Sequence, residues 1–350
     1  MQAKTYQVVI VGYGGMGSQH AKMLKDVKRM NVYGTYDIRE ERQQAARNNG
    51  YHTYETLDEV LTDSQVDIIL IATPNDIHKE IAVKAMEAGK HVICEKPVTM
   101  NSEEFQVILD TAEKENKVFA VHQNRRWDED FLVIKELYDN KELGEVFNIE
   151  QRIHGSRGIP GDWRHEKQFG GGMMLDWGVH IIDRITILIP EKITDIYCKM
   201  SYVLGNEVDD GFKLLITFES GKTAVFEVGT CHYISLPIWY MTGTEGSVTI
   251  EDWDMNGKIA KLMSHQDKDA TPIEAGAGLT KTMAPRGENT VNEYPIPRIK
   301  SDVREFYYNF VDVIEGNGEL VVKNHEVMRV MKIMEAAFKS SERNEVVPFE

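Results

Sequence analysis

The stretch Gly12-Tyr13-Gly14-Gly15-Met16-Gly17 decides the fold of this chain. It follows a short apolar run at residues 7–11 and leads directly into a helical pattern. Glycines in such a turn allow a tight bend, a close approach of the backbone to a pyrophosphate, and close packing of a helix on a strand. The phosphates would lie at the helix N-terminus, where backbone N–H groups are free. The stretch therefore predicts a strand, a nucleotide-binding turn and a helix.

An acidic residue further along the chain extends this prediction. Asp37 ends the second predicted strand, 20 residues after Gly17. In dinucleotide-binding folds an acidic residue at this place binds the ribose 2′-hydroxyl. It would repel the 2′-phosphate of NADP, so NAD is the expected cofactor, although Arg39 is near enough to accept a phosphate. The alternative interpretation is a surface aspartate at the end of a strand.

Short β-branched runs alternate with helical patterns as far as residue 123. Strands are predicted at 7–11, 32–36, 66–72, 91–94 and 118–122, and helices at 16–27, 77–88 and 102–115. Strands separated by helices of this length form βαβ units around a buried parallel sheet. We therefore predict the α/β fold class, with a doubly wound Rossmann domain at residues 1–123.

Longer strand patterns joined by tight turns follow from residue 124. Strands are predicted at 145–153, 195–203, 213–218, 223–228, 236–242 and 247–251, with an apolar helix near 176–188 and closing helices at 302–314 and 326–341. Residues 219–222 link two of the strands as a hairpin. We predict an α+β domain at 124–350 with an open, mainly antiparallel sheet. One face of such a sheet is free for subunit pairing, which favours a homodimer or homotetramer.

A polar segment at residues 264–300 interrupts this second domain. It has weak periodicity and contains Ala275-Gly276-Ala277-Gly278 and Pro285-Arg286-Gly287. A loop of this length in a compact domain is usually functional or disordered. We interpret it as an arm that either covers the site or reaches a neighbouring molecule.

Composition limits the possible partners. A length of 350 residues indicates about two domains. The formal net charge of -16 argues against nucleic acid or an anionic membrane as the main partner and favours a small molecule. The three cysteines are widely spaced and suggest reduced thiols in the cytoplasm. No basic leader and no apolar run of membrane-spanning length is evident.

Polar residues follow two more of the predicted parallel strands. Thr73, Pro74, Asn75 and His78 lie in a proline turn after one strand. Ligands of open α/β sheets bind at this edge, although Thr73 or Asn75 could simply cap the next helix.

The next strand is followed by Glu95-Lys96-Pro97. The proline disfavours a helical conformation for Lys96 and holds it extended at the same edge of the sheet. The Lys96 ammonium could therefore point into the crevice, although an isolated lysine more often has a solvated role on the surface.

The stretch Gly170-Gly171-Gly172-Met173-Met174-Leu175-Asp176-Trp177-Gly178-Val179-His180 carries the second group of candidates. Asp176 and His180 are four residues apart and would share a helix face with Asp183. Three interpretations are open for this polar stripe. It is a catalytic pair, a partial metal site, or an Asp176 cap followed by a hydrogen-bonded core histidine.

Taken in order, these motifs resemble the Gfo/Idh/MocA family, the group of glucose-fructose oxidoreductase and inositol dehydrogenase. The resemblance covers essentially the whole chain. It implies an N-terminal Rossmann domain, a C-terminal domain with an open sheet, and NAD in the cleft between them. It also implies that Lys96, Asp176 and His180 are catalytic, and that Trp163-Arg164 contacts cofactor and substrate.

The motifs and the resemblance together give the predicted site. Cofactor contacts are predicted from Gly12, Tyr13, Gly14, Gly15, Met16, Gly17, Asp37, Arg39, Thr73, Pro74, Asn75, His78, Glu95, Lys96, Asn124, Trp163 and Arg164. Substrate contacts are predicted from Arg125, Arg126, His154, Arg164, Asp176 and His180. No metal is expected.

The expected reaction is NAD-dependent oxidation or reduction of a secondary hydroxyl or ketone on a sugar, glycoside or cyclitol. His180 suits the acid/base role because its ordinary pKa is close to working pH. Asp176 could orient the substrate hydroxyl, hold the imidazole tautomer or stabilise its charged form, while Lys96 stabilises charge on the oxygen. Two alternatives are a redox-neutral glycoside-processing enzyme that retains NAD and acts through a 3-keto intermediate, and a non-catalytic NAD-binding regulator.

Overall fold

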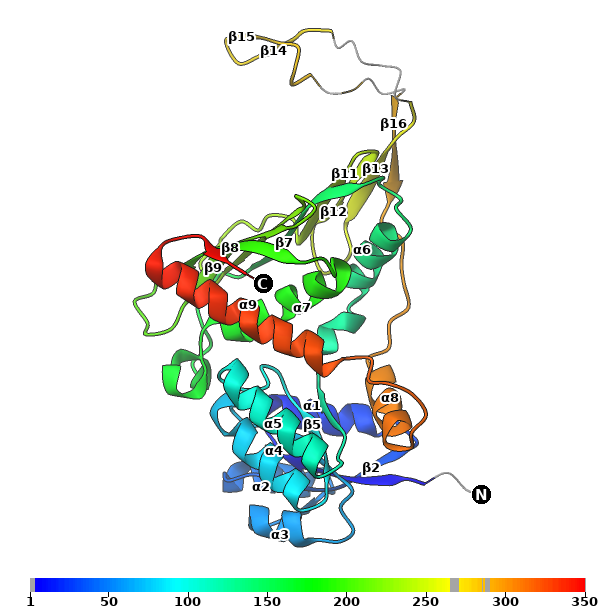
Figure 1. The fold of residues 1–350 in the computed structure, drawn as a ribbon, viewed down its shortest axis with the longest axis vertical. Helices are drawn as coiled ribbons and strands as arrows, with labels where there is room; N and C mark the ends of the chain where they lie inside the picture. Colours follow the sequence, from blue (N-terminus) through cyan, green and yellow to red (C-terminus); the bar gives the residue numbers. More distant parts are fainter. Residues whose placement is uncertain (1–3, 265–270, 285, 287–289, 350) are drawn as a thin grey trace.

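Two sheets, each covered by helices, organise the chain (Figure 1). The computed structural model describes residues 4–264, 271–284, 286 and 290–349. Within these ranges, no helix combines the length and the apolar character that crossing a membrane requires.

The first sheet is a six-stranded parallel sheet in the order β3-β2-β1-β4-β5-β6. Its strands are β1 (Tyr6–Val11), β2 (Met30–Tyr36), β3 (His52–Thr53), β4 (Ile68–Ile71), β5 (His91–Cys94) and β6 (Phe119–Val121). The connecting helices are α1 (Gly15–Leu24), α2 (Glu40–Asn48), α3 (Leu57–Thr62), α4 (His78–Glu87) and α5 (Ser102–Lys114). This confirms the predicted Rossmann sheet, to which the structure adds α2, α3 and the short β3.

The central strands are buried on both faces, which explains their continuous β-branched character. Every side chain of β4 is inaccessible to solvent. Each fully buried Val, Leu or Ile stabilises the fold by about 1.5–3 kcal/mol relative to exposure.

The second sheet has nine strands in the order β16-β13-β12-β11-β7-β10-β9-β8-β17. Only β7 and β10 pair in parallel, so the predicted mainly antiparallel sheet is confirmed. The bounds are β7 (Val146–His154), β8 (Ile193–Ser201), β9 (Gly211–Phe218), β10 (Thr223–Gly229), β11 (Trp239–Gly243), β12 (Gly246–Ile250), β13 (Gly257–Leu262), β16 (Val291–Pro295) and β17 (Val347–Pro348). The predicted hairpin joins β9 to β10, whereas β13, β16 and β17 were not predicted.

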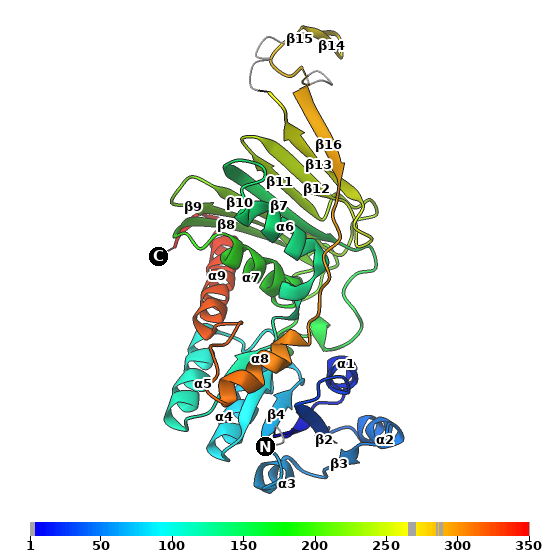
Figure 2. The ribbon, with the colours of Figure 1, turned by 90° about the vertical axis from the view of Figure 1, so that its right-hand side faces the viewer.

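Helices cover one face of this sheet, the face turned toward the first domain (Figure 2). They are α6 (Glu129–Asp139), α7 (Val179–Leu188) and α9 (Asn324–Arg343). Along β7 the buried residues Ile149, Gln151 and Ile153 alternate with less buried ones, as expected for a strand with one covered face. The opposite face is open.

Within the polar segment, β14 (Ile273–Ala275) and β15 (Gly278–Thr280) form a small hairpin, whereas β16 belongs to the second sheet. It projects beyond the outer edge of the second sheet, at the end of the molecule remote from the first domain (Figure 1). The interpretation that this arm covers the site is therefore wrong for the hairpin. Residues 265–270, 285 and 287–289, including Pro285 and Gly287 of the predicted motif, lie outside them.

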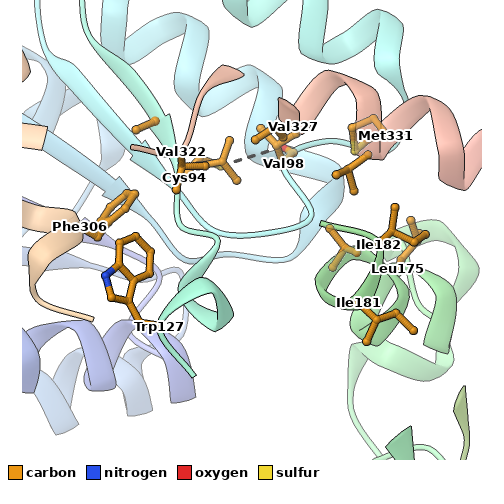
Figure 3. Close-up of a cluster of buried hydrophobic side chains, with 14 of the residues drawn as sticks. Cys94, Val98, Trp127, Leu175, Ile181, Ile182, Phe306, Val322, Val327 and Met331 are labelled. Atoms are coloured by element: carbon orange, nitrogen blue, oxygen red, sulfur yellow. Dashed lines mark hydrogen bonds between the residues drawn. The ribbon is translucent and has the colours of Figure 1, made fainter. Parts of the chain in front are cut away.

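The closing helices return to the first domain. The Tyr307 hydroxyl of α8 (Glu305–Ile314) lies 2.7 Å from Nδ1 of His20 on α1. Figure 3 shows the apolar seam between the halves, where Cys94 and Val98 lie near Val322 and Val327. Both predicted C-terminal helices are confirmed, and they contact both halves of the molecule.

A buried ion pair fixes α7 to the start of the second domain. Two guanidinium nitrogens of Arg126 donate to the Asp183 carboxylate at 2.6 and 2.8 Å, and a third donates to Glu326 at 2.7 Å. The side chains of Arg126 and Asp183 are 8% and 2% exposed. Arg126 therefore binds other residues of the protein, and the prediction that it contacts a substrate is wrong.

We expect Arg126→Met to destabilise the protein by about 3–5 kcal/mol, because it leaves Asp183 buried without its main partner. The control is Arg126→Met/Asp183→Leu, which removes both charges and should recover much of the loss. Unfolding in urea, followed by far-UV circular dichroism, gives both values. A single variant within about 1 kcal/mol of wild type would show that the pair does not hold these elements.

Candidate active site

The glycine turn between β1 and α1 is built by close backbone packing. A Cβ at Gly17 would lie 1.9 Å from the Gly12 carbonyl oxygen, so only glycine allows α1 to start this close to the strand. Gly12 has a φ of +93°, and its N–H donates to the Tyr36 carbonyl of β2 at 2.8 Å. These contacts explain why the stretch forms a tight turn.

The same turn leaves room for a ligand at the start of α1. No atom lies within 4 Å of a Cβ built on Gly14 or Gly15, in contrast to Gly12 and Gly17. Gly14 is the N-cap residue and provides no side-chain cap, so the first helical N–H groups are available. An anionic pyrophosphate fits this uncapped end and the positive end of the helix dipole.

Asp37 lies beside this turn, directly after β2. One carboxylate oxygen accepts from the Tyr13 N–H at 2.7 Å, and the other accepts from the Arg39 N–H at 2.9 Å. A carboxylate has about four acceptor positions, so it can still bind a ribose hydroxyl. The Arg39 side chain is exposed and lies 3.9 Å from Glu41.

The residues after β4 divide into two groups. Thr73 and Pro74 are half-buried at the sheet edge. Asn75 is buried and donates to the Gly170 carbonyl at 3.0 Å, which links the first domain to the glycine-rich stretch. His78 is fully buried, with ring nitrogens 2.9 Å from the Thr73 carbonyl and 3.1 Å from the Pro97 carbonyl. The structure therefore gives His78 a role in holding two turns, not the predicted cofactor contact.

Lys96 and Asp176 meet across the two domains. The Lys96 ammonium donates to the backbone carbonyl of Asp176 at 2.9 Å and to its carboxylate at 3.3 Å. Arg164 lies 3.3 Å from the same carboxylate oxygen, and its guanidinium stacks 4.6 Å from the ring centre of Trp163. Burial raises the pKa of Asp176, but Lys96 and Arg164 outweigh burial and leave that pKa below its ordinary value. Asp176 is therefore an anion held by two cations.

The backbone and the side-chain partners of Asp176 exclude two of the open interpretations, the helix cap and the partial metal site. Residues Met174–Gly178 form a π-helical turn, so Asp176 lies inside a helix and does not cap it. Such turns are rare and frequent at functional sites. Asp183 faces Arg126, while Asp176 faces Lys96. The stripe therefore does not assemble a partial metal site.

His180 lies in the first turn of α7, just after the π-helical turn. It is 5% exposed, and its Nδ1 is buried without a hydrogen-bond partner among the described residues. Burial holds the pKa of His180 well below its ordinary value, and the charges of Lys96, Arg125 and Arg184 act in the same direction. His180 is therefore a neutral imidazole near neutral pH. Because its buried Nδ1 has no described partner, it is not a core histidine with satisfied hydrogen bonds.

An aromatic wall beside His180 was missed by the sequence analysis. The Arg125 guanidinium lies 4.2 Å from the ring centre of Trp177 and 5.6 Å from that of Trp253. Trp253 is 55% exposed in the connection between β12 and β13. Its place in an acidic turn, Glu251-Asp252-Trp253-Asp254, is a signal that could have identified it. The predicted pocket residue Arg125 thus lies with two tryptophans beside the catalytic candidates.

Two other predicted residues lie elsewhere. His154 shares the open face of the second sheet with Glu227, and its ring stacks on His232 with centroids 4.1 Å apart. That face is turned away from α7, so His154 is not brought to the site. Glu95 is 4% exposed and accepts hydrogen bonds from His20 and His122, which leaves it inside the protein beneath Lys96. Asn124 begins the turn after β6, with a buried Oδ1 that has no partner among the described residues.

The Rossmann sheet has an uncapped glycine turn and an acidic residue after β2. These features define the class of dinucleotide-binding proteins. The chain belongs to the GFO/IDH/MocA family of oxidoreductases. A family model described as an oxidoreductase family with an NAD-binding Rossmann fold matches residues 6–123. The model of the GFO/IDH/MocA C-terminal domain matches residues 131–249. These matches confirm the predicted family and the NAD cofactor.

Three relatives are similar to this chain over nearly their full length. A crystal structure of an NAD-binding protein from Listeria innocua is 51% identical, with 99% of each chain covered and a TM-score of 0.96. An uncharacterised oxidoreductase of Schizosaccharomyces pombe is 30% identical over 94% of each chain. The scyllo-inositol 2-dehydrogenase (NADP(+)) IolW of Bacillus subtilis is 26% identical over 99% of this chain and 96% of its own.

We expect Asp37→Ala to relax discrimination between NAD and NADP by roughly tenfold, because it removes a charge that repels the 2′-phosphate. Titration of intrinsic tryptophan fluorescence with NAD+ and with NADP+ gives the two dissociation constants. Asp110→Ala, on the exposed side of α5, is the matched control and should leave their ratio unchanged. An unchanged ratio in Asp37→Ala would assign the discrimination to another residue.

Proposed function

We propose that this protein is an NAD-dependent dehydrogenase that oxidises a secondary hydroxyl of a sugar, glycoside or cyclitol. The observation that carries the proposal is the neutral, buried His180 beside the ion pair of Lys96 and Asp176. When bound, the nicotinamide accepts a hydride from the carbon that carries the hydroxyl. The residues must therefore remove the hydroxyl proton and stabilise the oxygen as it loses that proton.

His180 is the proposed base because a neutral imidazole can take a proton directly. Its buried position at the start of α7 excludes competing water. Lys96 provides a fixed cation for the negative charge that develops on the substrate oxygen, where it acts most strongly in a dry site. No side-chain hydrogen bond between Asp176 and His180 is present in the described residues, which speaks against control of the imidazole tautomer by Asp176. Asp176 instead holds Lys96 and Arg164 in place.

The aromatic wall supports a ring-shaped substrate. The faces of Trp177 and Trp253 offer apolar surface of the kind that stacks on the C–H face of a sugar or cyclitol. The Arg125 side chain is partly exposed, and its guanidinium would provide donors for a substrate oxygen. The inositol activity named for the Bacillus subtilis relative belongs to the same substrate class.

We also propose that residues 1–123 bind NAD and that 124–350 supply the substrate site and the contacts between subunits. The open face of the second sheet supports the proposal that residues 124–350 supply the contacts between subunits. It carries the partly exposed Leu215, and the loop beside His154 carries Tyr233 and Ile234, which are 88% and 85% exposed.

The proposal is tested by following NADH absorbance with a panel of hexoses, inositols, sugar acids and glycosides. We expect turnover with at least one member. His180→Ala should lose about a hundredfold to ten-thousandfold in turnover, and Lys96→Met about a hundredfold to a thousandfold, with NAD+ binding largely intact. His325→Ala and Lys332→Met, exposed positions on α9, are matched controls.

Two results would contradict the proposal. One is near-normal turnover of His180→Ala between about pH 6 and 9. The other is release of an aglycone without added NAD and without net NADH formation, which would identify the redox-neutral glycoside-processing reaction instead.

A further inference from the structure

The carboxylate of Asp128 lies beside Arg125, between the end of β6 and the start of α6. Asp128 is the N-cap residue of α6, yet its side chain makes no capping hydrogen bond to the helix. An aspartate in this position usually accepts from a backbone N–H of the first turn. Here Oδ2 of Asp128 instead accepts from Nη1 of Arg125 at 2.8 Å and from Nη2 of Arg184. The carboxylate therefore binds two arginines and does not cap the helix.

Arg125 connects this carboxylate to the active site. The guanidinium of Arg125 lies 4.2 Å from the ring centre of Trp177. The ring centres of Trp177 and His180 are 5.8 Å apart. The side chains of Arg125 and Asp128 are 28% and 29% exposed, so a ligand can reach both. Direct contacts thus link Asp128, through Arg125 and Trp177, to the proposed base.

Arg184 fixes Asp128 from inside the protein. The Arg184 side chain is inaccessible to solvent, and its Nε donates to the backbone carbonyl of Arg125 at 3.0 Å. Its Nη1 donates to Asp130 at 3.4 Å, and Nε1 of Trp239 donates to the same Asp130 oxygen at 2.8 Å. Buried groups therefore hold Asp128 in one place. Such support is what a residue needs if it is to discriminate between ligands.

Two other cations of the site are also paired with carboxylates. Lys96 lies 3.3 Å from Asp176, and Arg164 lies 3.3 Å from Asp176 and 2.8 Å from Asp162. A cation that already binds a carboxylate attracts a second anion less than a free cation does. Like charges that meet in a binding site reduce affinity. A sugar acid or a sugar phosphate would therefore be repelled by carboxylates that are already in place.

We propose that Asp128 is a specificity-determining residue, which selects an uncharged hexose or cyclitol over the corresponding sugar acid or phosphate. The inference rests on the proposed dehydrogenase function. Both arginines bind Oδ2, and no hydrogen bond to Oδ1 of Asp128 is present within the described residues. Oδ1 accepts a hydrogen bond from a hydroxyl of the bound ring. A substrate carboxylate in the same place has no proton to donate and is repelled by Asp128.

The proposal is tested with Asp128→Asn and Arg125→Gln, which change the charge in opposite directions. Glucose is compared with glucuronate, and myo-inositol with myo-inositol monophosphate, by kcat/KM or, where a ring is not turned over, by inhibition of the fastest substrate in the screen. Wild type should favour the uncharged ring about tenfold to a hundredfold. Asp128→Asn should reduce this preference about tenfold, because a repelling charge is lost. Arg125→Gln should increase it, because Asp128 loses a compensating cation.

Asp139→Asn, at the other end of α6 and half exposed, is the matched control and should leave both ratios unchanged. Folding is checked by circular dichroism and cofactor binding by titration with NAD+. If Asp128→Asn does not fold, the wild-type preference and the Arg125→Gln variant decide the question.

A wild-type preference for glucuronate or for the inositol phosphate would overturn the proposal without any variant. Unchanged ratios in folded Asp128→Asn would overturn it as well. In both cases the proposed function stands as long as the screen gives turnover that depends on His180. A screen without any turnover overturns the proposed function, and the role of Asp128 falls with it.

Discussion

The contact between Lys96 and Asp176 is the interaction on which the site depends. It is made by a residue at the edge of the parallel sheet and a residue in the π-helical turn of the second domain, 80 positions apart in the sequence. Both side chains are largely buried, so each charge is stabilised by the other, and Arg164 is the second cation beside Asp176. The bond from Asn75 to Gly170 and the pair of Arg126 with Asp183 hold the same two surfaces together. The position of His180 follows from these constraints.

The charge distribution of the site contrasts with that of the whole chain. The protein carries a formal net charge of -16, yet Lys96, Arg125 and Arg164 gather around Asp176 and His180. Burial keeps His180 neutral, and this local positive charge acts in the same direction and would favour negative charge on a substrate oxygen. Beneath it, Glu95 is a buried anion held by two imidazoles. The site thus separates a cationic layer around Asp176 and His180 from a buried anion whose partners lie within the protein.

Local pattern predicted much of this arrangement. The glycine turn, Asp37 and the parallel strands follow from periodicity and turn chemistry. The family resemblance implied that Lys96, Asp176 and His180 belong to one site, but not that Lys96 binds Asp176. The errors concern contacts between distant segments. The sequence does not show that Arg126 binds Asp183 and Glu326, because these partners lie 57 and 200 residues away. The face of the sheet on which His154 lies depends on the register of β7, and it is the open face. Trp253 comes close to Arg125 only when the second sheet has folded.

The account is tested most directly by an NMR titration of selectively labelled histidine in the NAD-bound protein, with His180 assigned from the His180→Ala spectrum. A group whose pKa is lowered on folding stays neutral until the pH falls below its ordinary value. We predict that His180 remains neutral well below pH 6.5, the ordinary midpoint for histidine, and that Lys96→Met moves its midpoint upward because a nearby cation is lost. A midpoint at or above 6.5 that Lys96→Met leaves unmoved would contradict the account.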